Sequence, residues 1–420
     1  MNTSSLTPAV RSERYRVIAA GVCALILTVG LARFAYTPLL PIMREQAELS
    51  HVAGGWLATI NYAGYIFGAL LAASISDLGR KFVLYRLGLV LGVASTAAMG
   101  LTDDVVLWAL LRFVAGFSST AGLLLASGLV LNWLLRQGHR PELGLHFMGL
   151  GLGIAVSGFA VGAMVDWLPW DQQWLGLGLL GLCFFVPAWR WLPPPATLKP
   201  AAGAASTTAV APPTLRWLWL MIAAYFCAGF GFVVSATFIV AILVQLPLLA
   251  GKGSWVWVIV GLAAAPSCFV WDRVAASIGQ IRALMIAYGL QAVATLLPVL
   301  SDSPALNVLG AILFGATFVG IVSLTLTLIG RHFPANPAKA MARMTLGYGV
   351  AQIGAPAMSG YIAAATGSYH GALVVTAVVM GAGMFLLRAV MAEERRSAGV
   401  DAAGAGETVA APRPCVEPAA

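Results

Sequence analysis

The sequence contains few charged residues for its length. Only 10% of the 420 residues are charged, whereas 60% are hydrophobic, and an ordinary soluble domain has about 25% charged residues. This shortage excludes a typical water-soluble domain and indicates a chain that lies within a lipid bilayer. The formal net charge of +8 therefore predicts no nucleic-acid partner. We attribute it to loops that meet anionic lipid headgroups.

Motifs for metal binding, phosphate binding and hydrolysis are also missing. None of the five cysteines forms a C-x-x-C pair, and four of them lie in apolar stretches, which favours packing over a disulfide or a metal site. No G-x-x-x-x-G-K-[ST], H-E-x-x-H or G-x-S-x-G pattern occurs, and no nucleophile and base stand out as a pair. We therefore expect no metal, no cofactor, no use of ATP and no enzymatic activity.

Long apolar runs are what the sequence does contain. Each is close to the ~20 residues that cross about 30 Å of hydrocarbon, with tilt absorbing any excess. Twelve such stretches are separated by polar breaks, at about 17–40, 52–76, 82–101, 105–133, 142–165, 173–192, 216–246, 254–271, 282–300, 304–329, 343–366 and 370–391. They predict an all-α integral membrane protein with about twelve transmembrane helices.

The basic residues alternate between the connections. Of the 24 Lys and Arg, 20 lie in the tails, the central break and every second connection, while the opposite connections hold only Arg44 and Lys252 beside seven acidic residues. By the positive-inside rule, we expect both termini to lie in the cytoplasm. The short loops favour a bacterial inner (plasma) membrane.

The longest polar interruption divides the chain into two halves. Residues 193–215 contain three consecutive prolines and many Ala and Thr, a composition that predicts a cytoplasmic linker. It separates an N-terminal six-helix bundle at 17–192 from a C-terminal six-helix bundle at 216–392. Residues 1–16 are predicted to be a cytoplasmic tail, and residues 393–420 a disordered cytoplasmic tail.

Short runs near the predicted loops resemble signatures of one transporter superfamily. Asp77-Leu-Gly-Arg-Lys81, which includes Gly79 and Arg80, is similar to a loop signature between the second and third spans, although one residue shorter. Asp272 and Arg273 resemble the start of the corresponding loop signature in the second half, with a longer spacer between its signature positions. These runs look like those of the major facilitator superfamily, the six-plus-six secondary transporters.

Further runs resemble one branch of that superfamily. Arg112-Phe-Val-Ala-Gly116 is similar to the R-x-x-x-G pattern of the fourth span, and the stretches 30–43, 55–65 and 314–322 look like the YbfB/YjiJ branch. The resemblance covers about residues 17–392. It implies two pseudo-symmetric bundles that rock about a midplane site, with the loop around Asp77, Gly79, Arg80 and Lys81 and its echo at Asp272 and Arg273 stabilising one conformation.

Two arginines lie within predicted spans, whereas every acidic residue lies in a loop, a tail or at a span end. An arginine at the bilayer centre costs about 2.5 to 3.5 kcal/mol on insertion scales, so it normally faces a bundle interior or an aqueous cavity. Arg33 and Arg112 both fall about 12 Å below the outer face. Together they predict a receptor for a small anion such as a carboxylate. Alternatively, they snorkel or bond backbone carbonyls near Pro38 and only hold helices together.

Polar and aromatic residues near the arginines predict the rest of a substrate site. Tyr36 shares a helix face with Arg33, and Asn61, Tyr62 and Tyr65 form a polar stretch in the second span. Gln352 lies on the eleventh span, before a proline. The alternative for these residues is ordinary hydrogen bonding between helices or an interfacial position.

Groups that could carry a coupling proton are scarce. His146 is the one histidine near a span interior, close to its cytoplasmic end, and an interfacial histidine with satisfied hydrogen bonds is the alternative. Asp104 and Asp166 lie at outer helix ends and would serve only if cavity water reaches them.

We therefore interpret the chain as a secondary active transporter that moves a small solute, specifically a small organic anion, by alternating access. Its expected partners are this small molecule, the lipid bilayer and a coupling proton. One rival is proton-linked efflux of apolar or cationic compounds, which calls for an acidic residue in the cavity. Another is a non-transporting membrane receptor or assembly factor built on the same fold.

Overall fold

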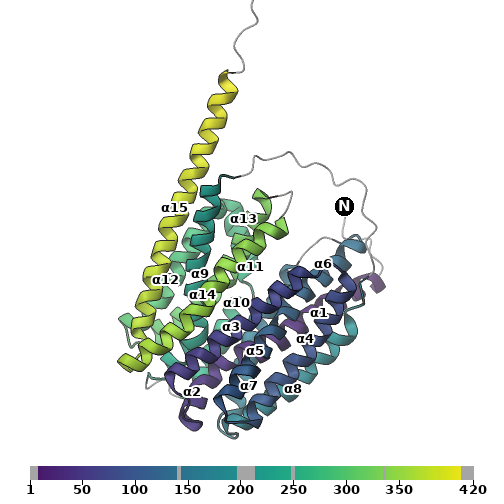
Figure 1. Ribbon diagram of the computed structural model, residues 1–420, viewed down its shortest axis with the longest axis vertical. Coiled ribbons are helices and arrows are strands. Elements are labelled where there is room, and N and C mark those ends of the chain that lie inside the picture. The colour runs from purple at the N-terminus through teal and green to yellow at the C-terminus, as the bar shows by residue number, and fades with distance from the viewer. Residues whose placement is uncertain (1–7, 140–142, 196–212, 247–250, 334–336, 408–420) are drawn as a thin grey trace, which may run out of the picture.

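The computed structural model describes residues 8–139, 143–195, 213–246, 251–333 and 337–407. Within these ranges the regular elements are all helices, and no strand occurs (Figure 1). This confirms the predicted all-α fold.

The first half begins with one long segment, Ser12–Gln46, that changes from α-helix to π-helix and back to α-helix. The following helices run back and forth across the molecule (Figure 1). The elements of this half are α1 (Pro8–Leu25), η2 (Ile26–Phe34), α2 (Tyr36–Gln46), α3 (His51–Ser74), α4 (Leu78–Ala98), η3 (Met99–Leu101), α5 (Val105–Thr120), η4 (Ala121–Ala126), α6 (Ser127–Arg136), α7 (Gly144–Met164) and α8 (Trp170–Trp191).

The second half repeats this back-and-forth course with longer helices. One of its spans is broken, because α10 and α11 meet at a bend of 43° next to Pro266, whose ring interrupts helical hydrogen bonding. The elements are α9 (Leu215–Leu243), α10 (Gly253–Ala264), α11 (Ser267–Ile278), α12 (Gln280–Leu300), α13 (Pro304–His332), α14 (Pro337–Thr366) and α15 (His370–Glu407).

The spans agree closely with the predicted apolar stretches. Ten helices in the described ranges are long and apolar enough to cross a bilayer, or eleven when α10 and α11 count as one bent span. The eleventh predicted stretch, at 343–366, corresponds to α14, a helix of 30 residues that is not among these. The predicted set of about twelve membrane helices is therefore present as helical segments.

Two helices extend beyond the predicted boundaries. α1 begins at Pro8, inside the predicted tail 1–16, and α15 continues to Glu407, so the first part of the predicted disordered tail is helical. The extension of α15 contains Ala, Glu and Arg, which favour a helix even outside a membrane, although it also contains three glycines, which do not. Residues 196–212 of the predicted linker, and residues 408–420, lie outside the described residues.

Helix starts are fixed by polar side chains that accept hydrogen bonds from the first backbone N–H groups. Ser50, Asp77, Asp104 and Thr214 each cap the helix that follows them in this way. A cap satisfies backbone donors that no intrahelical carbonyl can reach.

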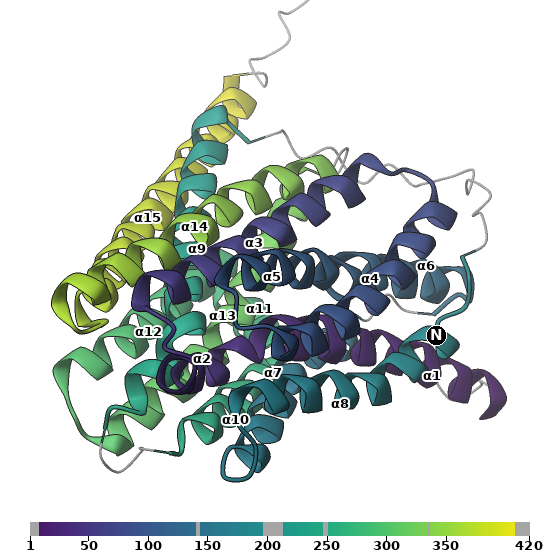
Figure 2. The ribbon, with the colours of Figure 1, turned by 60° about the horizontal axis from the view of Figure 1, so that its bottom comes forward.

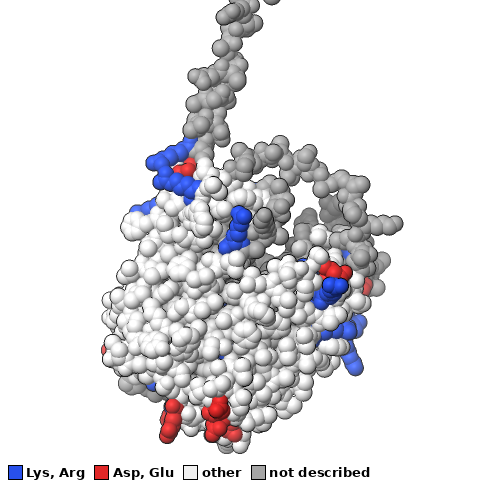
Figure 3. Space-filling model, in the orientation of Figure 1, with Lys and Arg blue, Asp and Glu red and all other residues white. Residues whose placement is uncertain are grey.

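The two ends of the molecule differ in charge. We call the end that carries Glu48, Asp103 and Asp166 the acidic end, and the end that carries Arg80 and Arg136 the basic end. In Figure 3, acidic residues gather at the lower end of the visible face and most Lys and Arg lie toward the upper end. This separation follows the alternation of charge along the sequence.

The two halves are held together near the acidic end. Thr37 Oγ1 donates a hydrogen bond of 2.6 Å to the carbonyl of Ala236 in the other half. Gly55 of α3 lies so close to α14 that an added Cβ would approach the Pro356 carbonyl oxygen to 2.6 Å. Toward the basic end, α9 and α15 diverge from α1 and α6 in both ribbon views (Figures 1 and 2).

Candidate functional site

The two span arginines lie side by side on different helices of the first half. Arg33 is part of the π-helix η2 and Arg112 is part of α5, and their exposed fractions are only 4% and 2%. The change between π- and α-helical hydrogen bonding, together with the missing N–H of Pro38, leaves backbone carbonyls of this segment available to other donors.

The Arg112 guanidinium is occupied by the protein itself. Its two terminal nitrogens donate to the carbonyls of Ala32 (3.1 Å) and Arg33 (3.2 Å). Its Cζ lies 4.4 Å from the centre of the Tyr36 ring. This is the arrangement of the helix-joining alternative, because Arg112 fastens α5 to the carbonyls of η2 and leaves little of its guanidinium for a ligand.

The Arg33 guanidinium is covered by rings but makes no hydrogen bond with any described residue. Its Cζ lies 4.4 Å from the Tyr62 ring centre, 4.7 Å from that of Tyr65 and 5.4 Å from that of Phe34. Nε is completely occluded without a partner, whereas the terminal nitrogens are not completely occluded. Arg33 therefore presents donors that are unpaired among the described residues, beside three aromatic rings.

No carboxylate balances these two cations among the buried described residues. The buried charged side chains there are Arg33, Arg112 and histidines, without a single Asp or Glu. A buried charge that lacks a partner is destabilising. The charge of Arg33 thus has no counter-charge among the buried side chains that the structure describes.

The neighbours that were predicted from sequence divide into two groups. Tyr36 donates its hydroxyl to the Gly54 carbonyl (2.9 Å) and Asn61 donates Nδ2 to the Arg112 carbonyl (2.8 Å), so both join helices. Tyr62 and Tyr65 lie against Arg33, and their hydroxyls bond no described residue.

The second half contributes aromatic residues that sequence reasoning missed. Phe232 of α9 packs edge-on against Tyr62 at 6.3 Å between ring centres and is stacked on Tyr348 of α14 at 6.0 Å. Tyr225 of α9 lies 4.5 Å from Tyr348. Their signal in the sequence is weak: Tyr348 precedes Gln352 by four residues and so shares its helix face.

Gln352 is buried in α14, with an exposed fraction of 2%, and its Oε1 has no partner among the described residues. Four residues further on, Pro356 breaks the backbone hydrogen bonding. Thr59 of α3 repairs this break, since its hydroxyl donates to the Ile353 carbonyl (2.9 Å) and accepts from the Ala357 amide (3.1 Å).

The predicted gating residues are exposed at the basic end. Asp77 accepts from the Arg80 amide (2.7 Å) and caps α4, and Arg80 and Asp272 are exposed, while Lys81 is partly buried. Arg273 donates a hydrogen bond to the Phe269 carbonyl (3.4 Å). Gly79 has room around it apart from the Asp77 carboxylate. In the described part of the chain, no ion pair joins this loop to the second half.

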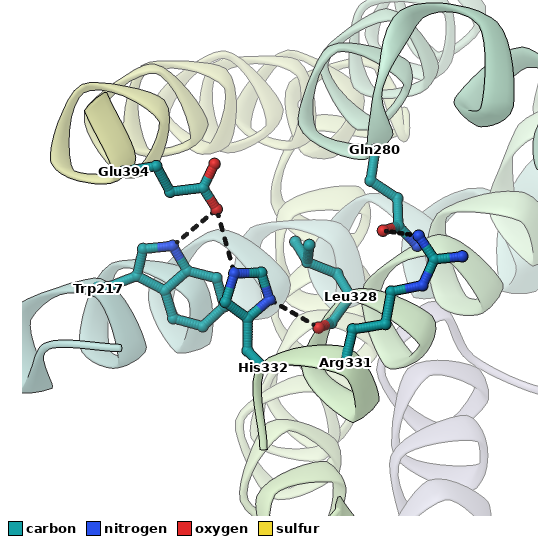
Figure 4. Close-up of polar contacts among 6 residues, drawn as sticks. All are labelled: Trp217, Gln280, Leu328, Arg331, His332 and Glu394. Atoms are coloured by element: carbon teal, nitrogen blue, oxygen red, sulfur yellow. Dashed lines mark hydrogen bonds and ion pairs between the residues drawn. The ribbon is translucent and has the colours of Figure 1, made fainter. Parts of the chain in front are cut away.

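A separate cluster at the basic end ties the helices of the second half to one another (Figure 4). The His332 ring is stacked on Trp217 at 4.6 Å, and Glu394 of α15 accepts from Trp217 Nε1 (3.1 Å) and lies 3.6 Å from His332 Nε2. Arg331 donates to Gln280 Oε1 (3.3 Å). This cluster holds α15 against α9 and α13, so it supports the fold of the half.

The three candidates for a coupling proton occupy unlike places. His146 is fully buried inside the first half, where Nε2 lies 2.8 Å from Ser127 Oγ and Nδ1 is without a partner among the described residues. Asp104 is an exposed cap whose carboxylate accepts from two amides of α5. Asp166 is exposed in the turn after α7. None of the three contacts Arg33 or Arg112.

The chain is similar to known membrane transporters. The family described as "Uncharacterised MFS-type transporter YbfB" matches residues 25–388. The uncharacterized MFS-type transporter YceJ of Bacillus subtilis (strain 168) is 33% identical over 97 residues, which are 23% of this chain and 25% of YceJ. The 4-hydroxybenzoate transporter PcaK of Pseudomonas putida is 28% identical over 184 residues, 43% of this chain and 41% of PcaK. The chain thus spans less than half the length of either relative.

Solved transporter structures share the arrangement of helices. The nucleoside transporter NupG has a TM-score of 0.68 at 16% identity, with 91% of this chain and 98% of that chain covered. A bacterial homolog of the human lysosomal transporter Spinster, in an inward-facing and occupied conformation, has a TM-score of 0.64 at 14% identity, with 92% and 98% covered. At such identities the likeness concerns the fold alone.

The family match, the relatives and the fold agree with the resemblance seen in the loop and span motifs. The matched family, the relatives and the proteins of similar fold are transporters rather than enzymes. The chain belongs to the major facilitator superfamily of membrane transporters, in the family described as the uncharacterised MFS-type transporter YbfB.

Proposed function

We propose that the protein is a secondary active transporter that moves a small organic anion by alternating access, and that Arg33 binds the anion. One observation carries the proposal: Arg33 is a buried cation with unpaired terminal donors and no buried carboxylate among the described residues. A guanidinium edge matches a carboxylate through two parallel hydrogen bonds. That one partial relative, PcaK, is described as a 4-hydroxybenzoate transporter also supports an organic anion.

In this proposal Arg112 is a positioning residue. Its bonds to the carbonyls of Ala32 and Arg33 fix the backbone that carries the Arg33 side chain. Tyr36 and Asn61 hold Arg112 and its helix in place, while Tyr62, Tyr65 and Gln352 line the anion site. The charge of Arg112 adds to the positive potential without being consumed in binding.

In this proposal, contacts between the halves form and break as the protein alternates between its inward-facing and outward-facing states. The halves meet at the acidic end through Thr37 and Gly55, and toward the basic end α9 and α15 diverge from α1 and α6, while α7 stays packed against α11 where Gly144 lies beside Phe269. With both termini in the cytoplasm of a bacterial cell, this is the state that opens inward. The loop around Asp77, Arg80 and Lys81 and its echo at Asp272 and Arg273 would then stabilise the opposite, outward-facing state.

Of the three candidates for a coupling proton, His146 fits the proposal best. Its buried Nδ1 lacks a partner among the described residues, so protonation there would change the packing of α1, α6 and α7. Asp104 and Asp166 are alternatives at the acidic end. Proton-linked efflux of cationic compounds, in contrast, would need an acidic group near Arg33 to offset its charge.

Ligand-induced stabilisation of the purified full-length protein tests the anion site. We expect small organic carboxylates to raise the melting temperature of the wild type, since a ligand at 100 times its dissociation constant adds about 2.7 kcal/mol. Arg33→Gln should remove this effect and abolish carboxylate flux into proteoliposomes. Arg33→Lys should retain part of it, because the charge remains but the two parallel hydrogen bonds do not.

Arg86 offers a matched control. It lies on α4 with its Cζ 4.6 Å from the Phe82 ring centre and 4.4 Å from that of Trp189, so it shares the cation–π setting of Arg33 at a different place. Arg86→Gln should respond to carboxylates like the wild type. Equal responses of Arg33→Gln and wild type, or stabilisation by cations alone, would contradict the proposal and favour the efflux or receptor alternatives.

A further inference from the structure

The contacts of Arg33 restrict how a ligand can approach it. Rings of Tyr62 and Tyr65 lie over the guanidinium at 4.4 and 4.7 Å. The hydrogen bonds of a guanidinium point outward in its plane. An anion therefore meets Arg33 edge-on, beside these aromatic rings.

Aromatic rings continue from this point into the other half of the molecule. Measured between ring centres, Tyr62 lies 6.3 Å from Phe232, Phe232 is stacked on Tyr348 at 6.0 Å, and Tyr348 lies 4.5 Å from Tyr225. Phe318 is also stacked on Phe232, at 5.2 Å. The row starts on α3 of the first half and ends on α9 and α14 of the second half, so it crosses the boundary that must open and close during transport.

Four tyrosine hydroxyls, three along this row and one on Tyr65 beside Arg33, are unpaired among the described residues. Tyr62, Tyr65, Tyr225 and Tyr348 make no side-chain hydrogen bond with a described residue, and none of these hydroxyls is completely occluded. By contrast, the buried hydroxyls of Tyr36, Tyr85 and Tyr288 each donate to a backbone carbonyl. Buried tyrosines normally find a partner, so unpaired hydroxyls around one cation indicate a ligand with polar groups.

We propose that the anion is a planar aromatic carboxylate. Its carboxylate would accept two hydrogen bonds from Arg33, its ring would pack against the edges of Phe232 and Tyr348, and hydroxyls of Tyr225 and Tyr348 would bond a polar group on the far side of the ring. The inference rests on the proposed function, because it uses the same site. It adds that residues of the second half select the ring, whereas Arg33 alone selects the charge.

The test compares ligands that differ in one property at a time. Binding to the purified protein in detergent is measured for benzoate, 4-hydroxybenzoate, cyclohexanecarboxylate and benzamide. We expect benzoate to bind about two- to tenfold more tightly than cyclohexanecarboxylate, which has the same charge but no aromatic ring, because an aromatic pair adds affinity beyond the area that it buries. Neutral benzamide should not bind measurably. The 4-hydroxyl should tighten binding further.

Substitutions in the second half assign the selectivity to named residues. Phe232→Leu should reduce the ratio between benzoate and cyclohexanecarboxylate while the affinity for cyclohexanecarboxylate persists. Tyr348→Phe, which removes only a hydroxyl, should reduce the advantage of 4-hydroxybenzoate over benzoate. Tyr361→Phe is the control, since Tyr361 is on the same helix but 53% exposed.

The outcomes separate this inference from the proposed function. If cyclohexanecarboxylate and benzoate bind equally, and Phe232→Leu leaves their ratio unchanged, the anion site stands and the aromatic preference is refuted. If no carboxylate binds at all, the inference and the proposed function fail together. Binding of benzamide as tightly as benzoate would show an aromatic site that ignores charge, which also overturns the inference.

Discussion

His51, the first residue of α3, and Tyr369, which precedes α15, are joined by a hydrogen bond of 3.1 Å between Nδ1 and the tyrosine hydroxyl. The other ring nitrogen of His51 contacts Arg44 of α2, and Tyr369 is stacked on Phe238 at 4.5 Å. The contact therefore links the two halves at the acidic end. No motif in the sequence pointed to it.

Tyr369→Phe should loosen the closure at this end. The substitution keeps the stacking on Phe238 and removes a hydrogen bond worth about 1 kcal/mol, which shifts a two-state population about fivefold. Spin labels at Asp103 and His370, one in each half, would report a larger fraction of long distances. An unchanged distance distribution would show that the bond to His51 does not contribute to the closure.

Arg112→Gln and Arg33→Gln should differ in their effect on stability. Loss of Arg112 leaves the carbonyls of Ala32 and Arg33 unpaired and should destabilise the protein by about 1 to 3 kcal/mol. Loss of Arg33 removes a buried charge that has no acidic or hydrogen-bonding partner among the described residues, so the ligand-free melting temperature should stay equal or rise. Thermal melts without ligand measure both. Equal destabilisation by the two variants would mean that their roles are not divided as proposed.

Gly116→Ala should destabilise the first half. A Cβ at Gly116 would collide with the backbone carbonyl of Asn61 on α3, which requires the helices to move apart and should cost at least about 1 to 3 kcal/mol. Gly128→Ala is the matched control, because nothing lies within 4 Å of a Cβ there, and it should be neutral or slightly stabilising. Melting temperatures of the two variants decide the matter, and similar values would contradict the close approach of α3 and α5.

Thr59→Val should slow transport more than it weakens binding. The Thr59 hydroxyl bonds both the Ile353 carbonyl and the Ala357 amide where Pro356 interrupts α14. Its loss leaves both groups unpaired and should change how α14 moves against α3. Thr345→Val is the control, since the Thr345 hydroxyl bonds only within its own helix. Flux and affinity measured on the same preparations test this, and a parallel loss of both would instead indicate a direct role in binding.

The membrane fold can be predicted from the amino-acid sequence. Hydrophobic length and alternating charge specify where a chain crosses a bilayer, because no loop can satisfy its backbone in hydrocarbon. The apolar stretches therefore coincide with the helices, and the run Arg112 to Gly116 was enough to suggest a superfamily pattern. Arg33 and Arg112 stood out for the same reason, since a charge within a span is rare.

The contacts of these residues depend on how the helices pack against one another. Arg33 and Arg112 have the same side chain at the same predicted depth, yet one is bonded to backbone carbonyls and the other keeps its donors unpaired. The difference arises from the π-helical turn in η2, which contains Arg33, and from the rings of α3, which are distant from Arg33 in the sequence. Phe232 and Tyr348 come near Arg33 only because the two halves meet there, and a single sequence does not encode such pairings in its composition or periodicity.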